Sequence, residues 1–307
     1  MSSIIYNADQ EMMEYFRLNG LQTINFWRPS SQTNIRELKK GDYVFFYSWM
    51  SVANNMVRGI VGYGKYAASY HMVLDQMWRT FKNQNGCDTK QGLQKFIGKY
   101  ADSTNHKIHS LLITNVLFFN EPILLKSLSN NISPNIESYV YVDNGEQDVT
   151  DEILEQAKEV GINYWAATMN GVYVDETYFD RDLMYAKVCR IQKDIQDYAY
   201  NKTEMKRNEA ITKLILRDEA ILPVSGSNYA CVNVTSRFVD LYLPMSIRTK
   251  NNAELKMALG ELILWKHKLS HLTEDFHIIC VIEGANGKEL LHWVNDPYIR
   301  IVDKEEL

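Results

Sequence analysis

Short runs in which apolar and polar residues alternate, separated by turn residues, fill the first part of the chain. Alternation with a period of two puts successive side chains on opposite faces of a strand, so these runs predict a β-rich domain. The expected features are a strand at 43–49, a turn at Asn54-Asn55, a strand at 56–66 whose glycines would bulge it, and a β-rich run over 107–125 interrupted at Asn120-Glu121-Pro122.

Helical patterns interrupt and follow these strands. Apolar residues recur at helical spacing over 74–86, where a glycine would end the helix, and over 89–100. A further amphipathic helix is expected over 148–161, with Thr150 or Asp151 as its N-cap. Strand, turn, strand, two helices and a returning strand fit a small barrel with helical insertions. They do not fit a doubly wound sheet, in which strands and helices alternate evenly.

The pattern of the second half is that of an α/β unit. Helical periodicity runs from 180 to 222 with a break at 200–204, and a long helix is expected over 253–269. Strands are expected at 228–235, 237–243, 246–250, 276–284 and 298–303. We therefore predict an α+β fold in three parts: a barrel domain (1–145), an acidic margin with connector helices (146–205), and an α/β domain (206–307).

Charge is distributed unevenly along the chain, whose net value is −5. Residues 1–130 carry 14 Lys/Arg against 9 Asp/Glu, residues 131–180 carry 1 against 11, and the remainder balances at 18 against 18. A basic N-terminal domain can bind phosphates whatever the total charge. A solvated surface with uneven charge explains the same numbers, so charge alone leaves both interpretations open.

Composition indicates a folded globular protein, because 46% of the 307 residues are hydrophobic and 12% are aromatic. No apolar run has the length of a membrane-spanning helix, and the first residues have neither the basic start nor the apolar core of a signal peptide. We therefore expect a cytoplasmic location and no membrane partner. The cysteines are far apart and form no C-x-x-C pair, which predicts free thiols at Cys87, Cys189, Cys231 and Cys280.

The segment 24–49 concentrates seven aromatic residues beside arginine and amide side chains. Strand alternation puts Tyr43, Phe45, Tyr47 and Trp49 on one face. Aromatic residues fill protein cores as readily as they wall pockets. The segment therefore predicts either the edge of a β-barrel or the floor of a pocket that holds a flat ligand.

The same segment resembles the N-terminal domain of a group of restriction endonucleases. Those enzymes place a PUA-like barrel, related to the EVE and ASCH domains, in front of a nuclease. The similarity covers about the first 145 residues, and it is carried by an ordered set of short motifs rather than by one diagnostic motif. The motifs are Asn25-Phe26-Trp27-Arg28-Pro29-Ser30, Leu38-Lys39-Lys40-Gly41-Asp42, Phe45-Phe46-Tyr47, Gly59-Ile60-Val61-Gly62-Tyr63-Gly64, Trp78-Arg79-Thr80-Phe81 with Asn85-Gly86, and Ile113-Thr114-Asn115 to Phe118-Phe119-Asn120-Glu121-Pro122.

In that family the domain binds DNA and can take an unstacked base, in some members a modified one, into a pocket with aromatic walls. Extruding a base costs stacking energy, which aromatic side chains restore while polar neighbours contact the base edge. The resemblance implies a base-binding set at the mouth and walls of such a pocket: Asn25, Trp27, Arg28, Ser30, Tyr47, Trp49 and Tyr63.

The C-terminal pattern resembles the PD-(D/E)xK nuclease core. There an Asp on one strand and a Glu-x-Lys on the next hold Mg²⁺ against the scissile phosphate and position water. By this resemblance 238–243 carries Asp240 and 246–250 carries Lys250, and a helix follows. Arg248 stands where the second carboxylate is expected, and an arginine there would repel Mg²⁺ and bind phosphate itself.

Two explanations of this departure stay open. The second carboxylate can come from the following helix, with Glu254 or Glu261 as candidates, or from the preceding helix, with Glu219. Asp240 and Glu261 would then be the metal ligands. Otherwise the domain is an inactive relative of the nucleases that serves dimerisation or grips DNA through residues such as Arg248.

These resemblances imply a restriction-type, Mg²⁺-dependent endonuclease that flips a base of double-stranded DNA, with or without a base modification. Cutting both strands needs two active centres, so a homodimer that acts in phage defence is expected. The alternative is a non-catalytic reader of DNA or of modified bases, as part of a defence complex. A third interpretation is an RNA-directed protein, because PUA-like folds also serve RNA.

Overall fold

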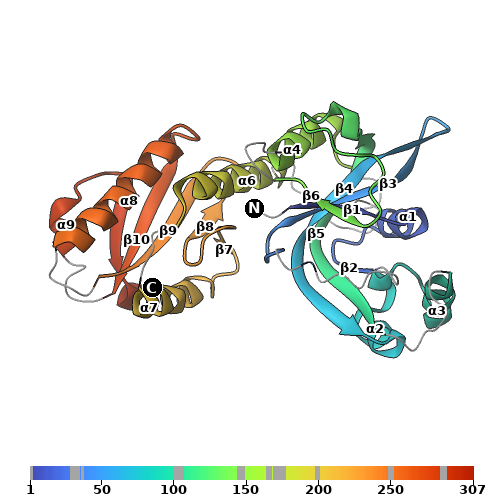
Figure 1. The fold of residues 1–307 in the computed structure, drawn as a ribbon, viewed down its shortest axis with the longest axis horizontal. Coiled ribbons are helices and arrows are strands. Elements are labelled where there is room, and N and C mark those ends of the chain that lie inside the picture. Colours follow the sequence, from blue (N-terminus) through green and yellow to red (C-terminus); the bar gives the residue numbers. More distant parts are fainter. Residues whose placement is uncertain are drawn as a thin grey trace. The chain divides into compact units, whose positions relative to one another are not determined.

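The computed structural model describes residues 3–27, 35, 38–99, 107–143, 149–163, 168, 178–197, 201–247, 252–283 and 289–307. The chain forms two compact units, here called the N-terminal unit (Ser2–Glu176) and the C-terminal unit (Thr177–Leu307) (Figure 1). The segment expected as a connector is divided between them. Its helix α4 (Val149–Val160) belongs to the N-terminal unit and its helix α6 (Tyr178–Ile195) to the C-terminal unit.

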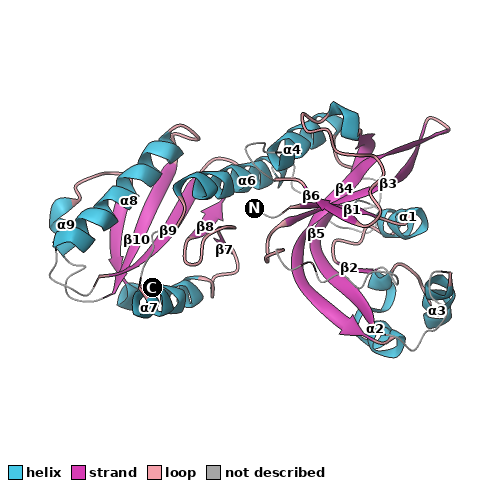
Figure 2. Ribbon diagram, viewed as in Figure 1, coloured by secondary structure: helices cyan, strands magenta, loops and turns pink. Residues whose placement is uncertain are grey.

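A six-stranded sheet in the order β2-β5-β4-β3-β1-β6 forms the N-terminal unit (Figure 2). All neighbouring pairs are antiparallel except β1 with β3. The strands are β1 (Ile4–Asn7), β2 (Ile24–Trp27), β3 (Tyr43–Val52), β4 (Asn55–Met72), β5 (Ile108–Ile123) and β6 (Tyr139–Tyr141). Besides α4, the helices are α1 (Gln10–Leu18), α2 (Leu74–Phe81) and α3 (Lys90–Gly98), with 3-10 turns at Lys82–Asn85 and Leu125–Ser127.

The expected closed barrel is wrong. Strands β2 and β6 are the two edges of the sheet, and no ladder joins them within the part of the chain that the structure describes. The sheet is nevertheless curled, since two strands that are not neighbours in it come into contact. Tyr6 on β1 meets Phe26 on β2 edge to face, with ring centroids 4.8 Å apart. Phe26 in turn lies 5.8 Å from Phe46 on β3. Apolar side chains of the sheet, α1, α2 and α3 pack into one core inside this curl.

The β3–β4 hairpin forms as the alternation predicts. Ala53 and Asn54 have φ values of 47° and 66°, the left-handed conformation that a two-residue hairpin loop requires. The expected bulging of β4 is confirmed by register shifts against β5 between Ile60 and Gly62 and further along. Strand β5 continues through the expected interruption at Asn120-Glu121-Pro122, but its ladder with β4 breaks there, because Gly62 pairs with Phe118 and Ile60 with Ile123. Among the described residues β2 pairs only with 110–113, so Pro122 lies where β5 has a strand on one side only, and proline is tolerated there.

A five-stranded sheet in the order β11-β10-β9-β8-β7 forms the C-terminal unit. The strands are β7 (Leu222–Pro223), β8 (Cys231–Val234), β9 (Val239–Ser246), β10 (Phe276–Glu283) and β11 (Ile299–Asp303), and β9, β10 and β11 are parallel. Besides α6, the helices are α7 (Lys202–Ile215), α8 (Asn252–Ser270) and α9 (Leu290–Trp293), with a 3-10 turn at Lys304–Glu306. Helices α7 and α8 lie on opposite faces of this sheet (Figure 1). The expected α+β class is confirmed.

The predicted strand at 246–250 falls mostly outside the described residues: Ser246 is the last residue of β9 and Ile247 belongs to no strand. Strand β9 itself is continuous over Val239–Ser246. Its partner β8 ends opposite Tyr242, which leaves Pro244 paired on one side only, and the strand therefore runs through the proline. The N-cap of α4 is not Thr150 or Asp151, which lie inside the helix. Asp143 supplies the cap contacts, accepting hydrogen bonds from the Thr150 amide and hydroxyl at 3.0 and 2.7 Å.

The four cysteines are free thiols, as expected. Within the described ranges, no helix combines the length and the apolar character needed to cross a membrane.

Candidate functional site

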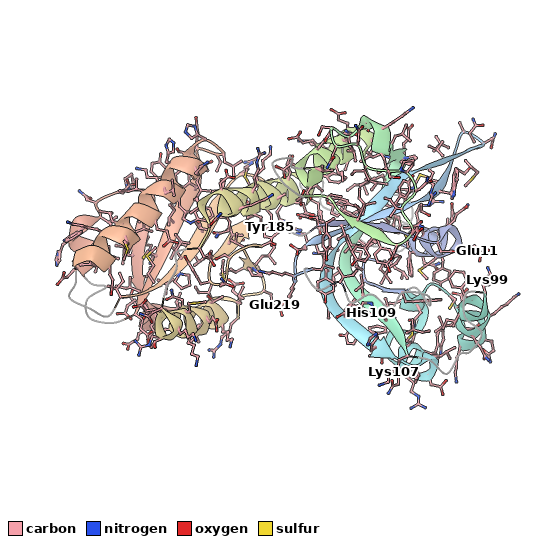
Figure 3. All side chains as sticks on the ribbon, viewed as in Figure 1. Glu11, Lys99, Lys107, His109, Tyr185 and Glu219 are labelled. Atoms are coloured by element: carbon pink, nitrogen blue, oxygen red, sulfur yellow. The ribbon has the colours of Figure 1, made fainter. Side chains whose placement is uncertain are left out.

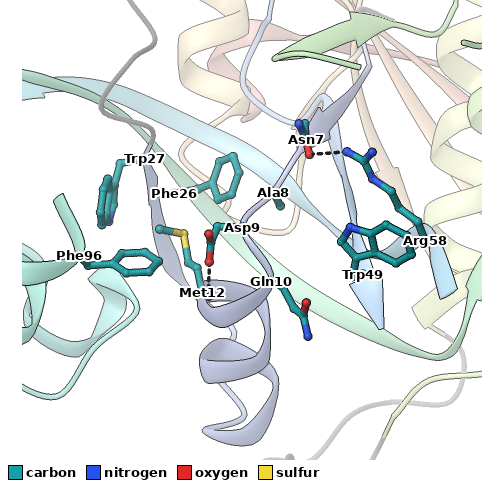
Figure 4. A pocket seen from close by; sticks show the side chains of 10 residues that line it. All are labelled: Asn7, Ala8, Asp9, Gln10, Met12, Phe26, Trp27, Trp49, Arg58 and Phe96. Carbon is teal, nitrogen blue, oxygen red and sulfur yellow. Dashed lines mark hydrogen bonds between the residues drawn. The ribbon is translucent and has the colours of Figure 1, made fainter. Parts of the chain in front are cut away.

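A pocket of about 340 Å³ lies in the N-terminal unit beside the start of α1 (Figure 4). Side chains from six of the unit's elements and the β1–α1 turn converge on it, which places its walls on packed strands and helices. Four of the lining residues are aromatic and one is an arginine. The lining residues are Asn7, Ala8, Asp9, Gln10, Met12, Phe26, Trp27, Trp49, Arg58 and Phe96.

Trp27 is a fixed wall of this pocket. Its side chain is 4% exposed, and its indole N–H donates a hydrogen bond of 3.0 Å to the Asn85 carbonyl oxygen. Its ring stands edge-on to Phe96, with centroids 5.5 Å apart and planes at 88°. The polar edge of the indole is thus already satisfied inside the protein, and the ring contributes surface rather than a hydrogen bond to the cavity.

A buried amide pair supports this wall from behind. The Asn25 side-chain amide donates to the Asn85 side-chain oxygen at 2.8 Å. The Asn85 amide donates in turn to the carbonyl oxygens of Met77 and Lys82, at 3.1 and 2.8 Å, and both asparagines are fully buried. Asn25 therefore does not lie at the pocket mouth as expected. Its amide group is used to join β2 to the turn after α2.

Arg58 is held over two aromatic rings at the rim. Its guanidinium carbon lies 4.7 Å from the centroid of the Tyr47 ring and 5.8 Å from that of Trp49. One of its terminal nitrogens donates to the Asn7 side-chain oxygen at 3.2 Å. Cation–π contacts of this kind stabilise by about 0.5–2 kcal/mol each, depending on solvation. The Nε of Arg58 is buried without a hydrogen-bond partner, and Arg58 makes no second side-chain hydrogen bond among the described residues, so its other terminal N–H groups remain for a ligand.

Trp49 is the accessible ring of the site. It is 45% exposed, far more than Trp27, and it pairs across the strands with Arg58. A large aromatic ring that stays exposed next to a cation is a platform on which a flat ligand can stack.

The polar lining offers donors and acceptors together. Asp9 caps α1, with one carboxylate oxygen accepting from the Met12 amide at 3.1 Å. The amide side chains of Asn7 and Gln10 line the cavity beside it (Figure 4). The Asn7 amide nitrogen already donates to the Ile136 and Glu137 carbonyl oxygens, at 2.9 and 3.4 Å. The carboxylate, the Gln10 amide and the guanidinium match the mixed donors and acceptors along the edge of a nucleobase.

The structure places the residues of the expected base-binding set in different environments. Trp27 and Trp49 line the pocket, while Tyr47 is 3% exposed and lies beneath Arg58. Arg28 and Ser30 lie outside the described residues.

Tyr63 was expected to form a wall of the pocket, but it does not, because its side chain is fully buried. Its ring packs at 5.6–6.0 Å from those of Tyr43, Phe45 and Phe119. Tyr43 and Phe45 pack with this buried group, whereas Tyr47 and Trp49 lie beside Arg58, so the aromatics of β3 do not share one site.

Several lining residues were missed by the sequence reasoning. Arg58 had a usable signal, because a two-residue hairpin loop at 53–54 places it opposite Trp49 by counting alone. No short-range sequence signal points to the other missed residues, since they reach the pocket only through the packing of α1 and α3 against the curled sheet. These residues are Asn7, Asp9, Gln10 and Phe96.

In the C-terminal unit Asp240 has a neighbour that was not expected. Its Oδ1 lies 3.1 Å from Nδ1 of His277, the residue opposite it on β10. Burial, followed by the charges of Asp240 and Asp218, raises the pKa of Tyr242 on the same face of the sheet. Asp240 and Asp218 thus both lie near Tyr242. Glu219, the expected contributor, is exposed in the turn after α7 (Figure 3).

Glu261 lies on the other face of this sheet. Its Oε1 accepts a hydrogen bond from the Tyr229 hydroxyl at 2.8 Å. Burial raises the pKa of the Cys280 thiol, and the Glu261 charge raises it further, which places Glu261 near Cys280. Cys280 and His277 are three positions apart on β10 and point to opposite faces. Asp240 lies beside His277 and Glu261 lies near Cys280, so the two carboxylates are on opposite faces of the sheet. The expected metal pair of Asp240 and Glu261 is therefore wrong.

Glu254 does not complete the site either. It lies in the first turn of α8, which begins beyond the carboxyl end of β9, whereas Asp240 is the second residue of that strand. The six residues from Asp240 to Ser246 span about 20 Å at roughly 3.3 Å per residue. The carboxylates expected to hold Mg²⁺ thus do not fit that ion as a group. Arg248 and Lys250 lie outside the described residues.

Comparisons with known proteins give a limited set of similarities. No protein-family model matches the chain, and no curated protein matches it. Among solved structures, the ASCH protein of Zymomonas mobilis is similar, with 12% identity and a TM-score of 0.35, over 50% of this chain and 94% of that protein. Two mutant forms of the same protein are 11% identical with TM-scores of 0.36, over 50% of this chain and 98% and 96% of theirs.

Proposed function

We propose that the N-terminal unit binds nucleic acid and holds one unstacked base in the pocket between Trp27, Trp49 and Arg58. The observation that carries this proposal is the combination of an exposed ring, a buried ring and a held guanidinium around one cavity of about 340 Å³. That volume lies within the range of about 300–1,000 Å³ that is usual for small-molecule sites.

Each part of the pocket has a role in this proposal. The exposed ring of Trp49 stacks on the base, which is worth about 1–3 kcal/mol per base in single-strand binding proteins. The remaining donors of Arg58 bind a base-edge acceptor or the adjoining phosphate. Asp9 and Gln10 contact the polar edge of the base, and Asn7 holds Arg58 in place.

The C-terminal unit has no catalytic role in this proposal. The separation of Asp240 and Glu261 onto opposite faces supports a reader over an endonuclease, because two-carboxylate Mg²⁺ chemistry needs both groups at one phosphate. The basic character of residues 1–130 supplies the long-range attraction to phosphates.

Replacing Trp49 by alanine tests the pocket. The loss of about 1–3 kcal/mol of stacking corresponds to an affinity about 5- to 150-fold weaker. Fluorescence anisotropy of a labelled 12-nucleotide strand, titrated with the full chain, measures the change. Trp293→Ala is the matched control, since Trp293 is 41% exposed and lies in the other unit. Equal affinities of wild type and Trp49→Ala would remove the basis of the proposal.

The same titration with DNA and RNA strands of one sequence identifies the nucleic acid. A labelled duplex with one mismatched pair, compared with the matched duplex, tests for an extruded base, because a mismatch lowers the cost of unstacking. We expect tighter binding to the mismatched duplex in wild type and a smaller difference in Arg58→Met.

Asp240→Ala distinguishes a reader from a nuclease. We expect the variant to bind the labelled strand with wild-type affinity, and wild type to leave supercoiled plasmid intact over hours with Mg²⁺ or Mn²⁺. Agarose gels report nicked and linear products. Cleavage by wild type that Asp240→Ala abolishes would establish catalysis and overturn the non-catalytic assignment.

A further inference from the structure

A second cavity, of about 400 Å³, lies within the C-terminal unit and is here called the α7 groove. One side of it is α7, and the other is formed by Glu283 and Lys304, at the carboxyl ends of β10 and β11. In open sheets with parallel strands, ligands bind in the crevice beyond these carboxyl ends. The lining residues are Thr203, Lys206, Arg207, Ala210, Ile211, Leu214, Glu283 and Lys304.

Positive charge dominates the α7 groove. Lys206, Arg207 and Lys304 face a single carboxylate, that of Glu283, which binds the Lys304 ammonium at 2.5 Å. No carboxylate pairs with Lys206 or Arg207 in the part of the chain that the structure describes. Lys206 and Arg207 are therefore available to an incoming anion, and Lys304, although paired with Glu283, keeps further ammonium N–H donors.

Side chains, and not helix amides, are the donors of this groove. The Asn201 side-chain oxygen accepts from the amides of Thr203 and Glu204, at 3.0 and 3.1 Å, and Glu204 completes a capping box. The first turn of α7 thus has its exposed amides satisfied internally. Ala210, Ile211 and Leu214 supply an apolar floor between the cations.

We propose that the α7 groove binds the phosphate groups of a nucleic acid through Lys206, Arg207 and Lys304. A guanidinium beside two ammonium groups suits a phosphate, whose oxygens accept several hydrogen bonds at once. The identity of the ligand rests on the proposed function, whereas the anion site rests on the groove itself. The same chemistry fits the backbone of a strand or a free nucleotide, and the experiment separates these two sources.

The test removes two charges from the groove of the full chain with Lys206→Gln and Arg207→Gln together. The matched control removes two charges from the same helix outside the groove, with Lys202→Gln and Lys213→Gln. With a labelled 20-nucleotide strand, we expect the groove variant to bind about tenfold more weakly and its plot of log affinity against log salt to be shallower by about 1.4, the value for two lost phosphate contacts. The control pair should change affinity less than twofold.

Equal losses in the two pairs, or none in the groove variant, would overturn the α7 groove as a phosphate site. Unchanged unfolding midpoints in both pairs confirm that folding is not the cause. Competition with a nucleoside monophosphate and with an unlabelled strand, at equal phosphate concentration, identifies the source. A strand ligand is expected, so the strand should compete far better, and equal competition would assign the groove to a free nucleotide instead.

Trp49→Ala, measured in parallel, keeps the two proposals apart. A groove defect with normal Trp49→Ala binding would contradict the base pocket and leave the phosphate site standing. Weak binding by Trp49→Ala, together with wild-type affinity of the Lys206→Gln and Arg207→Gln double variant, would contradict the phosphate site alone.

Discussion

Asn85→Ala is expected to lower the free energy of unfolding of the N-terminal unit by about 3 kcal/mol, since unsatisfied buried polar groups cost about 1–3 kcal/mol each. The Asn85 amide makes three side-chain hydrogen bonds, to Asn25, Met77 and Lys82. Without it the buried Asn25 amide loses its partner, and its own Oδ1 already lacks one among the described residues. The wall formed by Trp27 loses its support as well, so ligand affinity should fall with stability.

Urea unfolding followed by tryptophan fluorescence measures this loss. Asn83→Ala is the matched control, because Asn83 lies in the same 3-10 turn and is exposed. Its effect should stay within about 0.5 kcal/mol, as for most surface substitutions. A loss for Asn85→Ala no greater than that of the control would show that the amide pair does not hold β2 to the turn.

Gly62→Ala is expected to destabilise the N-terminal unit by about 3 kcal/mol or more, the upper part of the range for overpacked interiors. A Cβ atom at this position would overlap the Leu117 carbonyl oxygen and lie 3.1 Å from the Phe118 Cα. Both atoms belong to the backbone of β5, so no side-chain rotation relieves the clash. The two strands must separate next to the bulge at which β4 changes register.

Gly260→Ala provides the contrasting result. Gly260 is exposed within α8, and a Cβ there has no atom within 4 Å. Alanine should stabilise that helix by about 0.5–1 kcal/mol, because it restricts the unfolded chain and favours the helix. Differential scanning calorimetry and hydrogen exchange of the β4 and β5 amides measure the two effects. Normal exchange in Gly62→Ala would contradict the close approach of these strands.

Local patterns were sufficient for most elements of the fold. The hairpin at Asn54, the helices α2, α3, α4 and α8, and the strands β8, β9, β10 and β11 follow from periodicity and turn residues over short windows, whereas β7 was not expected. The two tryptophans of the pocket were identified through the resemblance carried by the aromatic-rich segment 24–49.

Features that depend on distant packing were not predictable in the same way. Which face of β9 carries Asp240 depends on strand register, and a shift of one residue would exchange the faces. The face of the sheet that α8 covers depends on the side on which the chain crosses from β9 to β10, and the position of Glu261 depends on it too. Closure of the sheet depends on contacts between its first and last strands, which are far apart in the sequence and leave no short-range signal.

The open sheet has a consequence for how the protein behaves in concentrated solution. Unpaired backbone groups along a sheet edge invite a strand from another molecule to add on, and long flat edges lead to aggregation. Here the terminal strands are only four residues (β2) and three residues (β6) long. Strands this short offer a foreign strand few hydrogen bonds, so β2 and β6 themselves carry little risk of intermolecular strand addition.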